Sequence, residues 1–351
     1  MTYALEPSGR TLALPAQVEL RAESAPGHRA PASLVRMTGD GRPAPMAGSW
    51  SEGTRTFGRL SALENLGLAQ PGCTEPIECA DGFRCEDGAC KACPANVSCQ
   101  ANPALPGPHN TGVPSGTSLV RHEGDIVLDT PGAVLEDRDI RGRLIIRASG
   151  VTVRRCVVHA PVPREIDGII SVRGATGVLL EDIEVFADES STLQWGVMGG
   201  GFTARRLDVH GVVVGMNLES GARVENSWIH ALDPVGAQYG ISVFEGRDIG
   251  IYDSNVHGPG EAAGAAVFVS QQDGPVRDVR VERNRLDRGS CIVNLGHAGG
   301  ASLPGMVVRN NVFGARTFYD CAVLVSTQTQ LSAAGNVWEA TGVEVPIERH
   351  D

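Results

Sequence analysis

A ten-residue pattern recurs nine times between residues 133 and 340, and it constrains the fold more than any other feature of the sequence. Its copies read AVLEDRDIRG, VTVRRCVVHA, VLLEDIEVFA, FTARRLDVHG, ARVENSWIHA, IGIYDSNVHG, VRVERNRLDR, MVVRNNVFGA and LSAAGNVWEA. Successive copies start 18, 27, 24, 20, 27, 30, 27 and 25 residues apart. Periods of this length are typical of solenoids. Positions 1, 3 and 8 are apolar almost throughout, which indicates short strands separated by turns.

Position 4 of the pattern tests this alignment. It carries Glu136, Arg154, Glu181, Arg205, Glu225, Tyr252, Glu282 and Arg309 in the first eight copies. Equivalent residues on stacked parallel strands lie about 4.8 Å apart, so that alternating signs attract each other. The first five copies alternate without exception. Position 6 adds a polar column in the later copies, with Ser227, Ser254, Asn284, Asn311 and Asn336.

A second series of strands precedes the pattern copies. Its segments read DGIISV, WGVMGG, VGMNLE, YGISVF, AAVFVS, CIVNLG and CAVLVS, starting at residues 167, 195, 214, 239, 265, 291 and 321. Alternation directs Met216 and Ile241 inward, and Asn217 and Ser242 outward. Two parallel sheets therefore wind around one core.

The repeats identify a family resemblance. Residues 119–351 resemble the right-handed parallel β-helix of the pectin-lyase-like superfamily. The strings PGPHNTGVPSGTSL before the first coil and GNVWEATG near the end are similar to those of secreted bacterial β-helix proteins. The resemblance implies an all-β fold of about nine rungs, where a rung is one turn of the coil. It does not fix the chemistry, because one fold serves many functions.

The segment before the repeats differs in composition, since residues 1–118 hold 13 of the 21 prolines. The strings GRTLALPAQVELRAE, SLVRMTGDGRPAPMAGSW and EGTRTFGRLSALENLGLA resemble part of a ZU5-like β-sandwich. We therefore expect a partial sandwich over residues 1–70 and a cysteine-rich module over 71–100. The Pro, Gly, Asn and Ser content of residues 101–118 predicts a linker.

The cysteine-rich module contains six of the nine cysteines: Cys73, Cys79, Cys85, Cys90, Cys93 and Cys99. We expect disulfides there, in any of fifteen pairings. The alternative is zinc, but only Cys90 and Cys93 have the spacing of a zinc knuckle. Disulfides would place the protein outside the cytoplasm, secreted or at the cell surface, with a leader that lies outside this chain.

Two further cysteines begin neighbouring strands of the second series. Cys291 and Cys321 occupy the same column, so we expect their Cα atoms within disulfide reach. Cys156 lies at an apolar position of the pattern, and we expect a buried thiol without a catalytic role.

Composition excludes several mechanisms and partners. Lys91 is the only lysine, so Schiff-base chemistry and phosphate-binding Gly-Lys-Ser/Thr loops have no suitable residue in the repeat region. The net charge of −11 argues against nucleic acid as the main partner. The sequence contains no stretch of 18 consecutive apolar residues, so it predicts no membrane-spanning helix. We expect a monomer.

An enzymatic alternative stays open. The resemblance implies, for a lyase, calcium held by carboxylates with a basic residue beside them. Such a set would comprise Glu181, Asp182 and Glu184 with Arg154, Arg155, Arg205 and Arg206. Because opposite signs alternate along these columns, we favour a structural charge ladder and expect no cofactor. The Asn-Thr-Asp, Asp-Asp and Arg-Ile-Lys motifs of polygalacturonase-type hydrolases are absent from the sequence, although carboxylates from different rungs leave a hydrolase open.

Histidines recur at position 9, as His159, His210, His230 and His257. Stacked imidazoles can bind a metal or transfer protons. Since Phe186 occupies the same column, we favour a stack of turn residues over a metal site.

Aromatic residues on the second sheet suggest contact with a glycan. Trp195 and Tyr239 enter their strands two rungs apart, about 10 Å, which is the scale of sugar units along a polymer. Aromatic rings bind the apolar faces of sugars, and Asn or Glu side chains bind hydroxyl groups. The expected site comprises Trp195, Tyr239, Asn217, Glu219, Phe244 and Asp167.

These observations favour a protein that contacts polysaccharide along one face. One alternative is a polysaccharide lyase or glycoside hydrolase, and another is a structural stalk or adhesin without activity.

Overall fold

The computed structural model divides into two compact units, Met1–Pro103 and Ala104–Asp351. In the first unit it describes the backbone of the strands alone. In the second it describes residues 105–350, apart from 162–165, 190, 233–237, 260–263, 297–301, 315, 316 and 318.

The first unit contains antiparallel strands only, within its described segments. One sheet has the order β1 (Thr2–Ala4), β7 (Asn65–Ala69), β3 (Ser33–Met37), β4 (Pro43–Pro45). A second sheet has the order β2 (Thr11–Arg21), β6 (Arg55–Ala62), β5 (Trp50–Glu52), and β8 (Phe83–Glu86) pairs with β9 (Ala89–Ala92). The side chains of the six cysteines lie outside the described residues, so their pairing stays a prediction.

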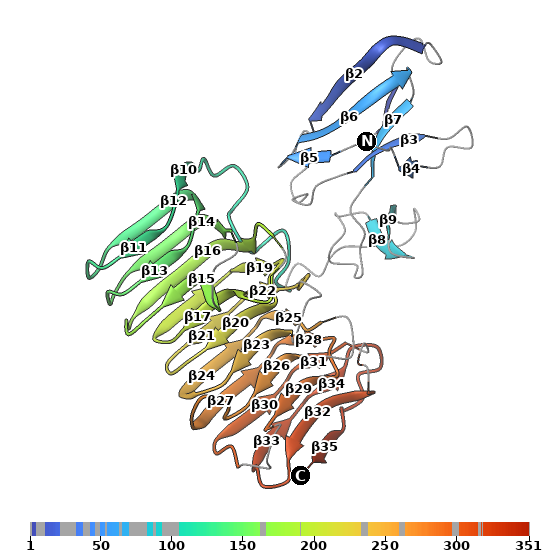
Figure 1. Cartoon of the computed structure of the whole chain (residues 1–351). Coiled ribbons are helices and arrows are strands. Elements are labelled where there is room, and N and C mark those ends of the chain that lie inside the picture. Colours follow the sequence, from blue (N-terminus) through green and yellow to red (C-terminus); the bar gives the residue numbers. More distant parts are fainter. Residues whose placement is uncertain are drawn as a thin grey trace. The chain divides into compact units, whose positions relative to one another are not determined.

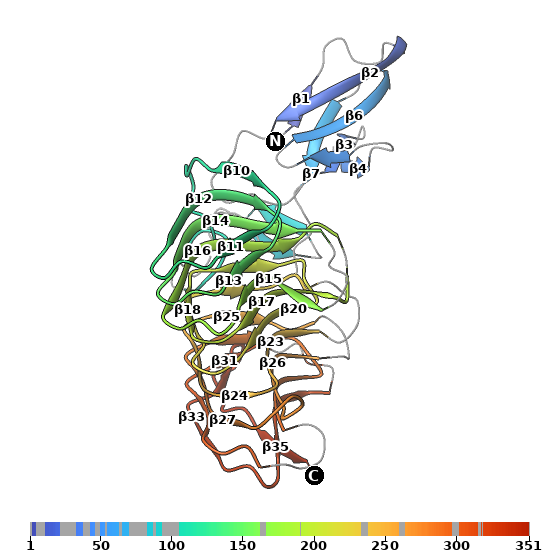
Figure 2. The ribbon, with the colours of Figure 1, turned by 60° about the vertical axis from the view of Figure 1, so that its left-hand side comes forward.

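The second unit is an all-β parallel solenoid, as the repeats predict. Its ten-stranded sheet has the order β11 (Ile126–Leu128), β13 (Leu144–Ile146), β15 (Asp167–Val172), β17 (Gln194–Gly199), β20 (Val214–Leu218), β23 (Tyr239–Val243), β26 (Ala265–Val269), β29 (Cys291–Leu295), β32 (Cys321–Ser326), β35 (Ile347–His350). Every strand pair in it is parallel. Figures 1 and 2 show these strands stacked in chain order along the solenoid.

A sixteen-stranded sheet completes each coil. It comprises β10 (Val120–Glu123), β12 (Val134–Arg141), β14 (Thr152–Ala160), β16 (Val178–Ala187), β18 (Phe202–Arg205), β19 (Asp208–His210), β21 (Arg223–Glu225), β22 (Trp228–Ile229), β24 (Gly246–Tyr252), β25 (Asn255–His257), β27 (Val276–Glu282), β28 (Arg285–Asp287), β30 (Met306–Arg309), β31 (Val312–Phe313), β33 (Leu331–Ala334) and β34 (Val337–Trp338). From β18 onward each pattern copy contributes two short strands instead of one long strand.

The predicted register is confirmed along the whole column of position 4. Glu136 pairs with Arg154, and each later residue of that column pairs with the next, through Arg309. The repeats missed β10, β11, β13 and β35, which lie towards the two ends of the stack. β10, β11 and β35 carry mostly exposed or half-buried side chains and therefore lack the apolar pattern, whereas β13 is buried but only three residues long.

A sharp bend follows position 4 in every copy. Position 5 carries Asp137, Arg155, Asp182, Arg206, Asn226, Asp253, Arg283, Asn310 and Gly335, all with φ between 48° and 67°. This left-handed conformation is costly for a residue with a side chain. Ion pairs along the axis accompany the bend. Arg155 Nε lies 2.7 Å from Asp137 Oδ1, and Arg283 Nε lies 2.8 Å from Asp253 Oδ1.

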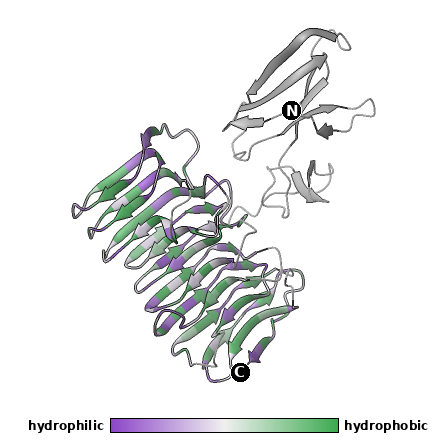
Figure 3. Cartoon of the chain, viewed as in Figure 1, coloured by the Kyte–Doolittle hydropathy of each residue, from purple (hydrophilic) through white to green (hydrophobic). Residues whose placement is uncertain are grey.

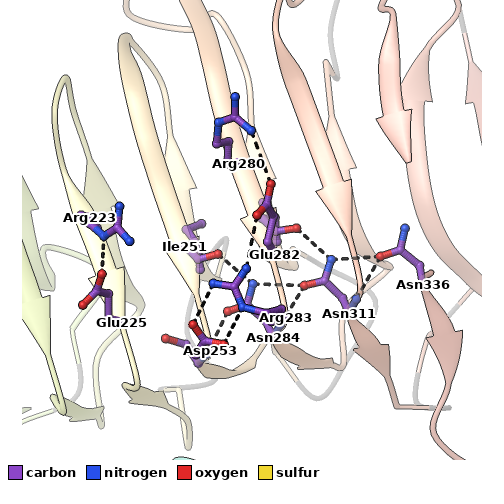
Figure 4. A network of polar contacts seen from close by, with 12 residues as sticks. Arg223, Glu225, Ile251, Asp253, Arg280, Glu282, Arg283, Asn284, Asn311 and Asn336 are labelled. Carbon is purple, nitrogen blue, oxygen red and sulfur yellow. Dashed lines mark hydrogen bonds and ion pairs between the residues drawn. The ribbon is translucent and has the colours of Figure 1, made fainter. Parts of the chain in front are cut away.

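The predicted polar column at position 6 forms a hydrogen-bonded ladder (Figure 4). The backbone N–H of Asn284 donates to Oδ1 of Asn311 at 2.9 Å, and the N–H of Asn311 donates to Oδ1 of Asn336 at 3.2 Å. Ser227 and Ser254 continue the ladder, because Ser227 N–H donates to Ser254 Oγ at 3.1 Å and Ser254 N–H to Asn284 Oδ1 at 2.9 Å. Backbone groups that the bend removes from the sheet thus gain buried partners.

One continuous apolar core fills the solenoid. Positions 1, 3 and 8 and the inward residues of the ten-stranded sheet supply it, and Figure 3 shows apolar and polar residues alternating along the strands. Cys156 lies in this core, fully buried, and burial raises the pKa of its thiol to about 11. Such a thiol stays protonated at neutral pH and is a poor nucleophile.

The aligned cysteines form a disulfide. Cys291 pairs with Cys321 in register on β29 and β32, and their Cα atoms lie 4.7 Å apart. The bond joins two consecutive rungs on the outward side of the ten-stranded sheet.

Part of the segment with linker composition packs against the solenoid. Pro106 and Val113 are buried, and the N–H of Gly112 donates to the carbonyl of Arg206 at 2.8 Å. The side-chain amide of Asn255 donates to the carbonyl of Pro106 at 3.1 Å. Residues 105–113 therefore belong to the solenoid unit, which begins at Ala104.

The ladder gives a test of stability. Asn311 is fully buried, accepts bonds from Asn284 and donates to the carbonyl of Val281. Asn311→Ala should lower the free energy of unfolding by about 3 kcal/mol, because buried groups left without partners cost about 1–3 kcal/mol each. Urea denaturation measures this, with the exposed Gln330→Ala as control. Equal stability of the two variants would contradict the conclusion that the hydrogen bonds of Asn311 stabilise the fold.

Candidate functional site

Trp195 and Tyr239 lie in one outward column of the ten-stranded sheet. Trp195 pairs with Val214, which pairs with Tyr239, which in turn pairs with Ala265. The two rings therefore belong to strands β17 and β23, separated by one strand, as the alignment of the sequence predicts.

The structure surrounds these two rings with phenylalanines. The ring of Phe244 lies 6.2 Å from that of Trp195 and 6.1 Å from that of Tyr239, measured between centroids. Phe268 stacks on Tyr239 at 4.5 Å with an interplanar angle of 23°. We call Trp195, Tyr239, Phe244 and Phe268 the aromatic cluster. Such pairs are worth about 0.5–1.5 kcal/mol beyond burial.

Burial divides the cluster into a floor and a surface. Phe244 and Phe268 each keep 7% of their surface exposed, whereas Trp195 and Tyr239 are half-buried. Burial also raises the pKa of the Tyr239 hydroxyl. Trp195 and Tyr239 can therefore touch a ligand, and the phenylalanines hold them in place.

Phe268 is not among the residues predicted for the site, although the alternation of its segment contains the signal. In AAVFVS, the phenylalanine aligns with Ser242, and Ser242 aligns with Asn217. The register that directs Asn217 outward therefore directs Phe268 outward as well.

Two polar residues lie beside the aromatic cluster. Asn217 belongs to β20, and Glu219 follows the last residue of that strand. Asn217 is 6% exposed, in the column between Met198 and Ser242. Glu219 is half-buried, and its pKa is raised by burial and then by the negative charges of Glu245 and Asp273. A carboxyl with a raised pKa keeps its proton to a higher pH and can donate it.

Asp273 lies in the turn after β26, one rung beyond the turn that carries Phe244. Its backbone N–H donates to the carbonyl of Phe244 at 3.1 Å. The turn after β26 therefore packs against the turn that carries Phe244 and Glu245. Neither Glu245 nor Asp273 shows a signal in the repeat pattern, because both lie in turns.

Asp167 takes part in a different network. Its carboxylate lies 2.8 Å from Arg143 and 3.0 Å from Arg173, and it accepts a bond from Ser171 at 2.9 Å. Burial pushes the pKa of Asp167 upward, but the hydrogen bonds from Ser171, Arg173 and the Gly168 N–H outweigh it and lower the pKa. The oxygens of Asp167 are thus engaged within the protein, and the structure does not bring it into the aromatic cluster.

The acidic and basic residues of the alternative lyase set form ion pairs with one another or with charged residues of neighbouring rungs. Arg206 lies 2.7 Å from Asp182 and 2.9 Å from Glu181, and Arg205 lies 3.3 Å from Glu225. Arg154 lies 2.7 Å from Glu136. The described residues contain no group of three or more His, Cys, Asp or Glu side chains arranged for a metal ion.

The histidine column stacks as the repeats predict. His159 lies 4.8 Å from Phe186, and Phe186 lies 5.3 Å from His210, with nearly parallel rings. Each of these histidines contacts a carboxylate, His159 that of Asp139 at 3.1 Å and His210 that of Glu184 at 3.4 Å. The stack fixes the ring orientations.

Comparisons with known proteins assign no family to this chain. The sequence matches no protein-family model and no curated protein. The solved catalytic domain of a GH87 alpha-1,3-glucanase in complex with nigerose is similar, with 8% identity, a TM-score of 0.36 and coverage of 97% of this chain and 89% of that chain. A variant of such a domain, also with nigerose, has 11% identity, a TM-score of 0.29 and the same coverage. Within the described part of the chain, no helix is long and apolar enough to cross a membrane.

The network of Asp167 predicts a pH-dependent effect. A lowered pKa in the folded state means that Asp167 stabilises the fold above about pH 3.9, the pKa of an unfolded aspartate, and loses this effect as the pH falls through its folded pKa. Asp167→Asn should therefore lower the Tm by roughly 2–6 °C at pH 7 and hardly at all at pH 2. Thermal unfolding at both values tests this, with the exposed Asp129→Asn as control. An equal loss at pH 2 would show that the charge of Asp167 is not the cause.

Proposed function

We propose that the solenoid unit binds a polysaccharide chain along the outward face of its ten-stranded sheet. The observation that carries this is the aromatic cluster, in which partly exposed Trp195 and Tyr239 rest on the buried Phe244 and Phe268. Their strands are separated by one strand, so the rings lie about 10 Å apart along the axis. That spacing suits two contacts along one sugar polymer.

The chemistry of the neighbouring residues supports a glycan. Aromatic rings pack against the apolar face of a pyranose, and the side chains beside the cluster include Glu219, which can bind hydroxyl groups. Because the phenylalanines fix both rings before a ligand arrives, little side-chain entropy is lost on binding.

The location that we propose is outside the cytoplasm, secreted or at the cell surface. The disulfide between Cys291 and Cys321 supports an oxidising environment, as does the number of cysteines in residues 73–99. A polysaccharide partner in the wall or matrix fits that location.

Removing both surface rings tests the binding site. Trp195→Ala with Tyr239→Ala should weaken binding to the preferred polysaccharide at least tenfold, since about 1.4 kcal/mol corresponds to tenfold and two ring contacts are lost. Affinity electrophoresis in gels containing neutral or acidic polysaccharides measures the change.

A matched control is Trp338→Ala, which removes a tryptophan of the other sheet that packs on Phe313. We expect unchanged retention for that variant. Equal retention of the double variant and the native protein on every polymer would refute the site.

A second function, glycoside hydrolysis, is favoured by one observation. Glu219 has a raised pKa and lies near two further carboxylates, Glu245 and Asp273, at the edge of the aromatic cluster. Glycoside hydrolases use a protonated carboxyl as acid and a second carboxylate as base or nucleophile. In this role Glu219 would protonate the leaving oxygen.

Incubation with a polysaccharide panel separates hydrolysis from binding. Under the hydrolase hypothesis, reducing ends form, the rate falls on the alkaline side as Glu219 ionises, and Glu219→Gln loses at least a hundredfold in rate while Asp129→Asn keeps it. Retention without new reducing ends or unsaturated product would leave a binding protein and reject the hydrolase.

A further inference from the structure

A trough on the sixteen-stranded sheet forms a second concave surface, on a different sheet from the aromatic cluster. Two adjoining hollows of about 570 Å³ and about 610 Å³ share Thr203, Gly221 and Asp248. Together they extend over five neighbouring strands, from β16 through β18, β21 and β24 to β27. At about 4.8 Å per strand, the trough is roughly 19 Å long and follows the solenoid axis.

Glycines form part of the floor of the trough. The residue before position 1 of the pattern is left-handed in the first eight copies, and in the first five it is glycine, of which Gly177, Gly201 and Gly221, with φ of 64°, 67° and 71°, line the hollows. In the next two rungs it is Asp248 and Asp278, each with φ of 56°. The glycines leave a low floor, and the two aspartates bring carboxylates to one end of it.

A tyrosine closes the side of the trough. Gly250 lies in the column of Arg223 and Arg280, and a Cβ atom there would clash with the ring of Tyr252. The ring of Tyr252 thus occupies the space above the glycine. Arg223 Cζ lies 4.4 Å from the ring centroid and Arg283 Cζ 5.5 Å, so cations of the two neighbouring rungs hold the ring in place.

The arginines of the trough are already neutralised. Arg223 forms an ion pair with Glu225 on the same strand, and Arg280 lies 3.5 Å from Glu282 (Figure 4). Arg205 lies between Glu181 and Glu225, at 3.6 Å and 3.3 Å. Each guanidinium keeps further N–H donors. The lining therefore offers hydrogen-bond donors and acceptors without an excess of positive charge.

This lining favours hydroxyl groups over anions and over peptides. An acidic sugar would meet the carboxylates of Asp248 and Asp278 with no uncompensated cation. An added peptide strand would need a free sheet edge, whereas each trough strand already pairs with a neighbour on both sides. Hydroxyl groups accept from arginine and donate to aspartate, and a volume near 600 Å³ lies within the range of ligand sites.

We propose that this trough binds an uncharged, hydroxyl-rich chain, a neutral glycan segment lying along the solenoid axis. This site is separate from the aromatic cluster and does not depend on the function proposed for it. Thr203, Tyr252 and Asp248 are the residues expected to contact the chain.

Filling the trough tests the proposal. Thr203 lies in both hollows and points outward, so Thr203→Trp should obstruct both. Thr152 occupies the same column two strands earlier, through Leu179, and lines neither hollow, which makes Thr152→Trp a matched control. Asp248→Asn keeps the shape and the left-handed turn but removes a carboxylate.

The probes are cello-, laminari- and maltohexaose, with hexagalacturonate as the acidic comparison, titrated calorimetrically into the full chain. We expect at least one neutral hexaose to bind, Thr203→Trp to weaken it at least tenfold, Asp248→Asn about threefold, and Thr152→Trp less than twofold. Affinity for hexagalacturonate above that for the neutral chains, full binding by Thr203→Trp, or no binding of any neutral hexaose would overturn the proposal.

The variant Trp195→Ala with Tyr239→Ala separates the two sites. If it keeps hexaose affinity while Thr203→Trp loses it, the trough is supported and the aromatic cluster is not. If it loses all affinity while Thr203→Trp keeps it, the trough proposal fails and the function proposed for the aromatic cluster stands.

Discussion

Contacts along the axis at the bend after position 4 hold the solenoid in register. Each rung bends there, and it does so through a left-handed residue that costs free energy when it carries a side chain. In the later rungs, the asparagine side chain of one rung accepts from the backbone of the preceding rung, as Asn311 does from Asn284. In the earlier rungs, ion pairs such as Arg155 with Asp137 take that role. Both contacts need neighbouring rungs at one fixed offset.

That offset determines which side chains of the ten-stranded sheet point outward and which of them align. Because parallel strands alternate their side chains, a shift of one residue would turn every outward residue inward. With the observed register, Trp195, Val214 and Tyr239 align, and Cys291 meets Cys321 within bonding distance. The aromatic cluster and the disulfide are therefore consequences of the same alignment that the bend enforces.

The sequence predicts features that repeat and misses features that do not. The alternating charges of Glu136 and Arg154 and the column of Asn284 and Asn311 are visible because copies can be compared, and the structure pairs them as predicted. The engagement of Asp167 with Arg143 and Arg173 depends on residues from other segments, so no local pattern indicates it.

The trough has no signature in the sequence, for a different reason. Gly201 and Gly221 have the composition of ordinary turn residues, and only the stacking of their turns creates a hollow. A missing side chain leaves no periodic signal of its own. Trp195 and Tyr239 are easier to predict, since tryptophan and tyrosine stand out in strands that otherwise carry small or branched residues.

In such a solenoid, ligand-binding sites are best sought where a residue differs in type from the other residues of its column. Most polar columns satisfy themselves: arginine meets carboxylate and asparagine meets backbone, which leaves few groups for a ligand. Tyr252 interrupts the charges of position 4, and Gly250 beneath it interrupts the side chains of position 2. Phe268 interrupts a column that holds Ser242 and Asn294 on either side. These interruptions are not needed for stacking, and both proposed glycan sites lie at them.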